Sequence, residues 1–402
     1  MATQPSWSPV EDAARTAYGR LVALLAARSG DLAGAEDALG DALVAALERW
    51  PRDGVPANPQ AWLMTVARRR RIDLARRRVR AGAALAELGR MRDEAEAREP
   101  DGFPDARLGL LLACAHPAID ASARTPLMLQ AVLGLTAERL ASAFLVSPST
   151  MTKRLVRAKA KLAGAGVGFT VPDREALPDR MEPVLDAVYA AFTLARDDGG
   201  NADLESEALW LGRLLAELAP DEPEAMGLLA LMLFVSARTR PAPDASYTPL
   251  SRQDPAGWDT GRLVEAEALL RGAGRAGRPG RFQLEAAIQA VHADRRRSGR
   301  TDWPSILVLY EGLVSITQAL GAQVGRAAAL AQSGDPVRAL KILDALDPAR
   351  IVAHQPYWAT RAHVLARAGR GAEAADAYRR AAGLTEQTGL RRWLLDHAAS
   401  LS

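Results

Sequence analysis

Apolar residues recur every three or four positions along most of the chain, and this spacing predicts helices almost throughout. The first predicted helix spans Val10–Arg28 and the second Leu32–Arg49, with Asp31 placed to cap the second. The apolar stripe of the second helix consists of Ala35, Leu39, Leu43 and Leu47. Another face of this helix carries three acids, Glu36, Asp37 and Asp41. The chain therefore opens with two amphipathic helices, of which the second has an acidic side.

An arginine-rich helix follows a proline-rich loop. The loop, "WPRDGVPANPQ" (50–60), holds three prolines, and Pro59 opens a helix that extends to Arg80. Eight arginines and one acid occupy positions 68–80, and such a run repels itself unless phosphates or another anion neutralise it. A solvated helix face and a nuclear-localisation signal are the alternatives. Trp62 is either a core residue, the commoner fate, or a platform for an unstacked base.

A second basic helix lies in a helix-turn-helix pattern at residues 135–162. Thr136 and Ser147 are placed as N-caps, and Pro148 takes the first position of the second helix. This helix has no acid, and its inward positions are Met151, Leu155, Ala158 and Leu162. The residues available for base and phosphate contacts are Ser149, Thr150, Thr152, Lys153, Arg154 and Arg157. An ordinary helical hairpin with a basic face is the alternative, but the turn, the caps and the one-sided charge together favour DNA binding.

Helical spacing continues from about residue 181 to the end, interrupted by a polar loop at 237–259. Two segments near the end, "GDPVRALKILDAL" (334–346) and "GRGAEAADAYRRA" (369–381), align with an offset of 35 residues. This offset is close to the period of tetratricopeptide repeats, which are helical hairpins. The second unit places alternating large and small residues at the repeat's packing positions: Trp358, Ala362, Leu365, Ala374, Tyr378 and Ala381.

Composition and charge narrow the class of protein. The 402 residues suffice for two or three domains, and a net charge of +3 predicts no general affinity for polyanions. A single cysteine, Cys114, fits a reducing compartment, and neither a secretory leader nor a membrane span is visible, so we expect a cytoplasmic protein. We expect a buried turn rather than a metal site at Cys114–His116. No metal-ligand spacing, phosphate loop or nucleophile motif occurs, so we expect neither an enzyme nor a cofactor.

The order of the motifs resembles regions 2 and 4 of a bacterial extracytoplasmic-function (ECF) sigma factor of RNA polymerase. The segments that carry the resemblance are "DLAGAEDALGDALVAALERW", "NPQAWLMTVARRRRIDLARRR" and "LTAERLASAFLVSPSTMTKRLVRAKAKL". They cover roughly residues 10–80 and 106–162, and the long helical extension is similar to that of one subgroup of the family. The resemblance implies an all-α fold with two small sigma-type domains followed by a solenoid-like, tetratricopeptide-like extension. Its domains would be region 2 at 1–80, an acidic linker at 81–105, region 4 at 106–165 and the extension at 166–402.

The resemblance also implies partners and roles. Glu36, Asp37 and Asp41 would bind the clamp helices of the polymerase β′ subunit, and region 4 would lie near the β flap. The −10 promoter element would meet Asn58, Trp62, Arg68, Arg69, Arg70, Arg71, Arg76 and Arg77, with a flipped base near Asn58. The −35 element would be read by the second helix of the helix-turn-helix. The extension would regulate activity in place of a separate inhibitor, through an unidentified ligand or protein.

Two positions depart from the family pattern: Gly40 stands where Gln is frequent, and Arg69 where Asn is common. Gly40 weakens the docking helix by about 0.5–1 kcal/mol relative to alanine. Two other functions remain open. One is a stand-alone helix-turn-helix regulator with a repeat-based sensor domain, and the other is a repeat scaffold that binds RNA or an acidic protein. The two different basic helices favour the sigma factor, because a stand-alone regulator needs only one.

Overall fold

The computed structural model describes residues 9–80, 106–144, 146–169, 178–197, 202–238 and 247–401. Within these ranges every regular element is a helix and no strand occurs, which confirms the predicted all-α fold. The chain divides into two compact units, Met1–Ala208 and Leu209–Ser402. No helix in the described part of the chain is long and apolar enough to cross a membrane.

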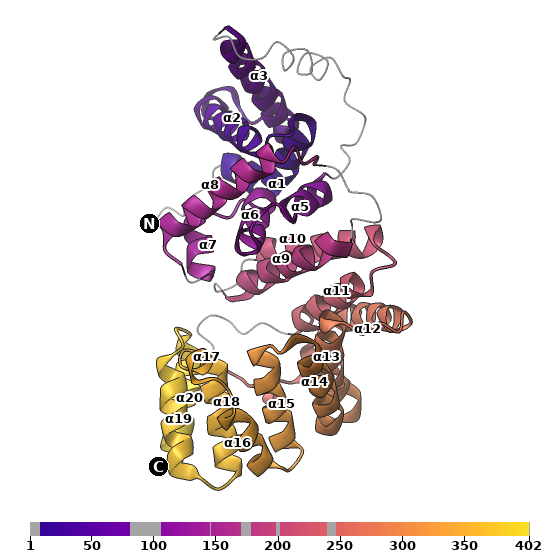
Figure 1. Cartoon of the computed structure of the whole chain (residues 1–402), viewed down its shortest axis with the longest axis vertical. Coiled ribbons are helices and arrows are strands. Elements are labelled where there is room, and N and C mark those ends of the chain that lie inside the picture. The colour runs from indigo at the N-terminus through magenta and orange to yellow at the C-terminus, as the bar shows by residue number, and fades with distance from the viewer. Residues whose placement is uncertain are drawn as a thin grey trace. The chain divides into compact units, whose positions relative to one another are not determined.

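The first unit begins with α1 (Pro9–Ser29), α2 (Leu32–Asp53) and α3 (Pro59–Arg80), which we call the first module (Figure 1). The Asp31 side chain caps α2 by accepting a hydrogen bond from the Gly34 amide at 3.0 Å, as predicted. The predicted loop at 50–60 is too long, because α2 continues through Pro51 to Asp53. The Trp50 ring is buried and packs edge-on against Trp62, which holds this last helical turn in place.

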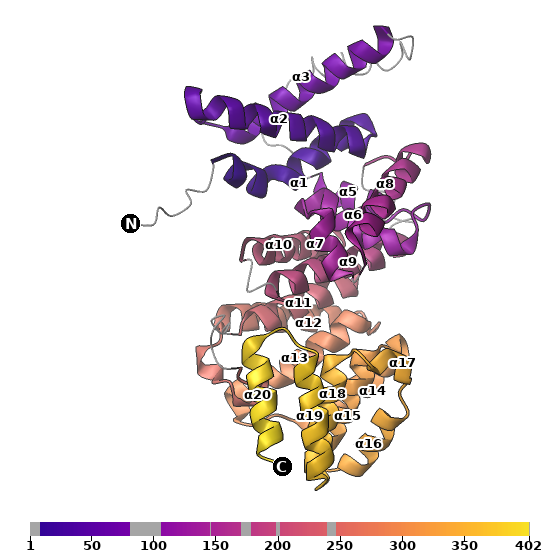
Figure 2. The ribbon, with the colours of Figure 1, turned by 90° about the vertical axis from the view of Figure 1, so that its left-hand side faces the viewer.

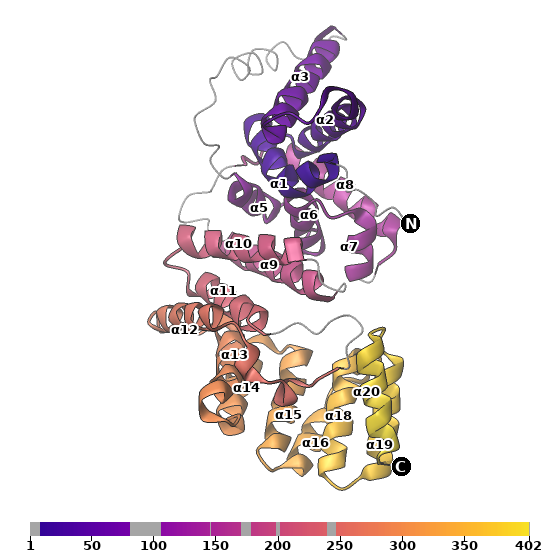
Figure 3. The ribbon, with the colours of Figure 1, turned by 180° about the vertical axis from the view of Figure 1, so that it is seen from behind.

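The second module follows and consists of α5 (Arg107–Cys114), α6 (Ala121–Leu133), α7 (Ala137–Ala143) and α8 (Pro148–Gly164). α5 is buried along nearly its whole length and packs on α1, α6 and α9 (Pro178–Asp197; Figure 3). The boundary between the two compact units falls inside α10 (Ala202–Leu218). The first unit therefore has a shared core to which both modules and α9 contribute.

The second unit starts around α11 (Pro223–Ser236), an apolar helix that is buried on almost every side. It packs against α12 (Thr260–Gly274) and α13 (Arg281–Ser298), and α13 packs in turn on α14 (Trp303–Thr317). Two short 3-10 turns, η1 (Leu250–Arg252) and η2 (Pro255–Gly257), precede α12. The buried Arg295 guanidinium ties this stretch to α13 by donating to the carbonyls of Leu250 and Gln253 at 2.8 and 2.6 Å.

The last helices form a row that continues from α14, seen from the side in Figure 1 and from the end with α19 and α20 in Figure 2. They are α15 (Leu320–Gln332), α16 (Pro336–Asp344), the short α17 (Pro348–Ile351), α18 (Gln355–Arg367), α19 (Gly371–Gly383) and α20 (Thr388–Ala399). The hairpin α15–α16 recurs 35 residues later as α18–α19, since the first helices start at 320 and 355 and the second at 336 and 371. Gly334 and Gly369 turn the two hairpins at equivalent positions with φ of 107° and 76°, a backbone region that favours glycine. The predicted period is therefore confirmed.

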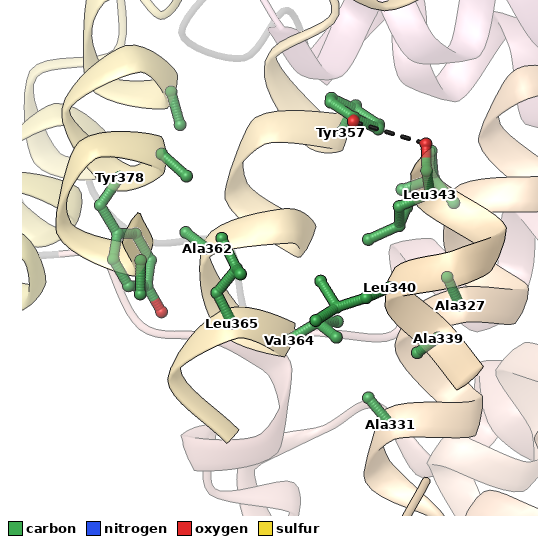
Figure 4. Packing of buried hydrophobic residues seen from close by; sticks show 14 of the residues in the cluster. Ala327, Ala331, Ala339, Leu340, Leu343, Tyr357, Ala362, Val364, Leu365 and Tyr378 are labelled. Carbon is green, nitrogen blue, oxygen red and sulfur yellow. Dashed lines mark hydrogen bonds between the residues drawn. The ribbon is translucent and has the colours of Figure 1, made fainter. Parts of the chain in front are cut away.

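Close packing of small residues joins the two helices of the hairpin α18–α19, as the sequence predicts (Figure 4). Ala362 on α18 and Ala374 on α19 are fully buried, which lets the two helices approach closely. Leu365 and Tyr378 fill the space beside them, and the Tyr357 hydroxyl donates to the Leu343 carbonyl at 3.5 Å. Trp358 is only half-buried. The guanidinium of Arg380 lies over its ring, 3.8 Å from the centroid.

Candidate nucleic-acid and protein-binding surfaces

The outer face of α2 combines acids with apolar side chains. Asp37 and Asp41 are exposed one helical turn apart, and Val44 continues their stripe with 55% of its surface exposed. Leu47, predicted to be a core residue, is 52% exposed. That prediction was wrong because the stripe turns gradually around the helix, so that Ala46 and Trp50 face the core instead. A surface of this composition suits a protein partner better than bulk water.

Glu36 faces inward, unlike the other two acids. Its carboxylate accepts a hydrogen bond from the Lys159 ammonium of α8 at 2.5 Å, and the two side chains are only 12% and 18% exposed. Burial raises the pKa of Glu36, and the neighbouring Lys159 charge opposes that rise. The pair borders an open hollow of about 520 Å³, which is also lined by Tyr18, Asp37, Gly40, Asp41 and Gln130.

The start of α3 holds the residues expected near an unstacked base. Asn58 is exposed, and its side-chain oxygen accepts a hydrogen bond from the Ala61 amide at 3.0 Å, so it caps the helix. Trp62 is half-buried, with its ring centroid 5.5 Å from that of Trp50. The Trp62 ring is therefore neither fully buried in the core nor fully free to stack on a base.

The arginines of α3 fall into three groups. Arg69 and Arg70 are exposed, whereas Arg68 and Arg71 are half-buried. Arg71 also donates to the Leu25 carbonyl at 3.3 Å, which ties α3 to α1. Arg76 and Arg77 lie on the same helix, but their side chains are outside the described part of the structure. Only part of the run is therefore seen to face solvent.

The pair α7–α8 has the local geometry that the sequence predicts. Thr136 caps α7 by accepting from the Arg139 amide at 3.3 Å, and Ser147 caps α8 by accepting from the Thr150 amide at 3.2 Å. The four predicted inward residues of α8 are all buried: Met151, Leu155, Ala158 and Leu162. The face of α8 opposite this buried stripe therefore points away from the core and is available for a ligand.

The outward face of α8 is polar and basic. Five of the six predicted contact residues are exposed: Ser149, Thr150, Thr152, Lys153 and Arg157. Arg154 is half-buried, because its guanidinium donates to the Ser122 carbonyl of α6 at 3.2 Å. Lys161 pairs with Asp120 at 3.0 Å beyond this group. Five predicted residues thus share one accessible surface, and the sixth is partly committed to the fold.

The contact between Lys159 and Glu36 was not predicted from the sequence. One signal was present: Lys159 follows Ala158 and lies one turn after Leu155, so it flanks the buried stripe of α8. A cation in that position points toward the edge of a packed surface rather than into open solvent. Its partner could not be inferred, because the two residues are 123 positions apart.

The described residues offer no site for a metal. No group of three or more histidine, cysteine, aspartate or glutamate side chains gathers within them. Cys114 is fully buried at the end of α5, and burial raises the pKa of its thiol, so the nucleophilic thiolate is disfavoured. His116 accepts a hydrogen bond from the Ala118 amide at 3.1 Å and serves the turn before α6. The prediction of a buried turn was wrong in part: Cys114 and Ala115 are buried, but His116 is half-exposed and the turn residues Pro117 and Ala118 are exposed, because the chain passes over the surface before α6.

Comparison with known proteins supplies the family. Residues 14–81 match sigma-70 region 2, and residues 180–274 match a family of unknown function, DUF6596. An uncharacterized protein of Rhizobium meliloti (strain 1021) is 36% identical over 382 residues, which cover 91% of this chain and 90% of that protein. The chain belongs to the same family as this protein. No solved structure matches the chain.

The region 2 match covers α2 and α3 entirely and most of α1, that is, the first module. It indicates a sigma factor with a role in transcription initiation, a non-enzymatic function that involves RNA polymerase core and promoter DNA. The DUF6596 match begins near the start of α9 and ends with α12. The DUF6596 match indicates no biochemical role, because the function of that family is unknown.

Proposed function

We propose that this family member is an ECF-type sigma factor that directs promoter-specific initiation through two helical modules. The observation that carries the proposal is the pairing of a region 2 module with a second, separate basic helix, α8, whose inner face is buried and whose outer face is polar. One basic module would suffice for a stand-alone regulator. Two different ones suit two promoter elements that are bound by one polymerase.

The outer face of α2 is the proposed docking surface for the β′ clamp helices. Asp37 and Asp41 supply charge at its centre, and the exposed Val44 and Leu47 supply apolar area beside them. Exposed charges steer association, whereas the buried apolar contacts hold the complex. Glu36, expected to share this role, contacts Lys159 instead and reaches polymerase only if that pair separates.

The proposed promoter contacts divide between α3 and α8. Arg69 and Arg70 would hold phosphates of the −10 region, and the cap residue Asn58 with Trp62 would border an extruded base. The N-terminal turns of α8 would enter the major groove at the −35 element, near the β flap, with Lys153 and Arg157 on the backbone. The family resemblance implies that Arg76 and Arg77 also contact the −10 element, but their side chains lie outside the part of the chain that the structure describes. The acidic linker expected at 81–105 also lies outside the described residues.

The helices after residue 166 are proposed as a tetratricopeptide-like regulatory region that acts with polymerase in the cytoplasm. The 35-residue recurrence of α15–α16 as α18–α19 and the small residues between the helices support the repeat assignment. Removing residues 181–402 should change the run-off yield, and an unchanged yield would remove the regulatory role. Such a deletion also uncovers buried α5 and α6, because α9 packs on both. A second variant, truncated after α9 so that α5 and α6 stay covered, must therefore be measured together with the deletion of residues 181–402.

The docking assignment is tested by replacing both exposed acids, Asp37→Ala with Asp41→Ala, and measuring binding to purified core polymerase. We expect weaker binding and a lower run-off yield with unchanged helical content. Asp53→Ala, an exposed acid on another face of α2, is the matched control and should bind like the original protein. Equal binding by all three proteins would favour a stand-alone helix-turn-helix regulator.

The α8 assignment is tested by footprinting and by the salt dependence of promoter binding. Each of Lys153→Ala and Arg157→Ala should weaken binding and lower the slope of log affinity against log salt by about 1. Lys161→Ala is the control, because Lys161 lies at the other end of the helix and pairs with Asp120. A footprint and slope unchanged by both test substitutions would exclude α8 as the DNA-reading helix.

A further inference from the structure

Residues 247–253 join the two ends of the helical row in the second unit. The row runs α13–α14–α15–α18–α19–α20, and each of these helices packs on the next. At one end the Tyr247 ring meets Trp393 of α20 edge-on, with 5.4 Å between the ring centroids. At the other end Arg295 of α13 donates a hydrogen bond to the Leu250 carbonyl at 2.8 Å. The segment can be followed across the row in Figure 3.

The length of this segment shows that the row is curved. Leu250 follows Tyr247 by three positions, so the backbone between the two contacts spans at most about 10 Å. Five neighbouring helix pairs, each about 8–10 Å apart, would place the ends of a straight row about 40–50 Å from each other. The ends must therefore bend toward each other, and the segment crosses the inner side of the bend. In repeat folds the inner side is the extended surface on which ligands bind.

The two ends of the segment are held with different strength. The Arg295 guanidinium is buried, and it lies over the Trp258 ring, 5.6 Å from the centroid, while it binds the Leu250 carbonyl. Hydrogen bonds from a charged donor are stronger than those between neutral groups. Tyr247 is 37% exposed, and its edge-on contact with Trp393 is a weaker, apolar one. The Tyr247 end can therefore detach while the Arg295 end stays in place.

Trp393 belongs to a preformed aromatic cluster on α20. The His397 ring lies against the Trp393 ring, with 3.9 Å between the centroids and 33° between the planes. The His397 Nδ1 atom donates to the Trp393 carbonyl oxygen at 2.9 Å, which fixes the imidazole beside the indole. Tyr378 of α19 supports the indole from a centroid distance of 6.3 Å. Trp393 is only half-buried, so this cluster offers a rigid ring face that Tyr247 covers in part.

We propose that Tyr247 is an intramolecular ligand of this cluster, and that an extended protein segment with an aromatic side chain binds there by displacing it. The chain's own segment shows the chemistry that the inner side accepts: a planar ring at Trp393, and a main-chain carbonyl that faces a cationic donor. Main-chain contacts combined with side-chain subsites are a general mode of recognition of extended peptides. The regulatory role under the proposed function thereby gains a binding site. The proposal rests on that function for its effect on transcription, but not for the binding itself.

Occupation by the chain's own tyrosine sets the affinity that a partner meets. Tyr247 is tethered close to its anchor, so its effective concentration at Trp393 is high. The cluster is open only in the fraction of molecules in which Tyr247 has detached, and the apparent dissociation constant of a partner rises in inverse proportion to that fraction. If about a tenth of the chains are open, a partner binds about tenfold more weakly than it would without Tyr247. Only a partner at high concentration, or one with further contacts along the inner side, would hold the cluster.

The test follows the Trp393 signal of the full chain by fluorine nuclear magnetic resonance. All eight tryptophans are replaced by 5-fluorotryptophan, and the Trp393 signal is assigned from its loss in Trp393→Phe. The probe is the acetylated peptide YTPLSRQD, residues 247–254, and the control peptide carries Tyr247→Ala. In the protein, Tyr247→Ala should shift the Trp393 signal because it removes a neighbouring ring, whereas Tyr247→Phe should leave the signal near its original position.

The probe should shift the Trp393 signal of the Tyr247→Ala protein saturably. The midpoint of this titration should lie about tenfold below that of the original chain, whose own tyrosine competes. The control peptide should leave the Trp393 signal unchanged. Leu395→Ala is the matched protein control, because Leu395 is an exposed apolar residue of the same helix and lies about 200° around the axis from Trp393. This variant should bind the probe as the original chain does.

Two results would overturn the proposal. One is a Trp393 signal that Tyr247→Ala leaves in place, because Tyr247 would then not contact Trp393 in solution. The other is the absence of a saturable shift when the probe is added to the Tyr247→Ala protein. Run-off transcription tests the consequence separately, since Tyr247→Ala and the added probe should change the yield in the same direction. Probe binding without any change in yield would instead refute the regulatory role in the proposed function, and would leave the binding surface established.

Discussion

His292 should make the stability of the second unit depend on pH. It lies on α13, and its ring meets Trp303 of α14 edge-on, 5.5 Å between centroids. Burial, reinforced by the charges of Arg238 and Arg295, lowers the pKa of His292 from 6.5 to about 4. The folded protein therefore keeps this imidazole neutral in a pH range where the unfolded chain protonates it.

The sign and size of the effect follow from this difference. Between the two pKa values the unfolded state binds more protons than the folded state, so stability falls as pH is lowered through 6.5 toward 4. Integrated from about pH 7.5 to about pH 5, the loss attributable to His292 is about 2 kcal/mol. Above pH 7 the contribution is constant, because the imidazole is neutral in both states.

Hydrogen exchange read by mass spectrometry localises the effect. Protection of peptides from α13 and α14, corrected for intrinsic exchange rates, should fall by about 2 kcal/mol between the two pH values. His292→Phe keeps a ring against Trp303 and removes the titration, so its loss should be smaller by that amount. Peptides from α1–α3 serve as the internal reference. An identical pH dependence in His292→Phe would refute the reasoning.

Two further predictions concern packing and capping. Ser147→Ala should destabilise the second module by about 1 kcal/mol, because α8 loses the side chain that caps the Thr150 amide. Ser149→Ala should change the stability little. Thermal unfolding followed by circular dichroism compares the two variants. Ala374→Leu should lower the free energy of unfolding by about 1–3 kcal/mol, because the larger side chain forces α18 and α19 apart. Ala372→Leu, at an exposed position of the same helix, should be tolerated. Equal midpoints of denaturant unfolding for the two variants would contradict the packing argument.

Features set by local chemistry were predictable from the sequence. The caps Asp31, Thr136 and Ser147 all accept the expected amide hydrogen bonds, because capping depends on residues three positions apart. The buried stripe of α8 and the 35-residue repeat are likewise local or periodic properties. Most of the fold follows from them, because the chain is helical nearly throughout its described ranges.

Features set by distant contacts were not predictable. Pro51 marked a loop in the sequence, but the burial of Trp50 against Trp62 keeps α2 helical to Asp53. Glu36 belonged by pattern with the exposed acids, yet Lys159 draws it into an interface. In both cases the deciding partner lies elsewhere in the chain, so no window of neighbouring residues contains the information.

The three acids of α2 differ in how readily a partner can reach them. Asp37 and Asp41 are exposed, so an approaching polymerase can make its first charge contacts with them while Glu36 still pairs with Lys159. Glu36 can add a contact only after that pair has separated. The initial charge complementarity of the proposed docking surface therefore depends on Asp37 and Asp41 rather than on Glu36, which is why the docking test replaces those two residues.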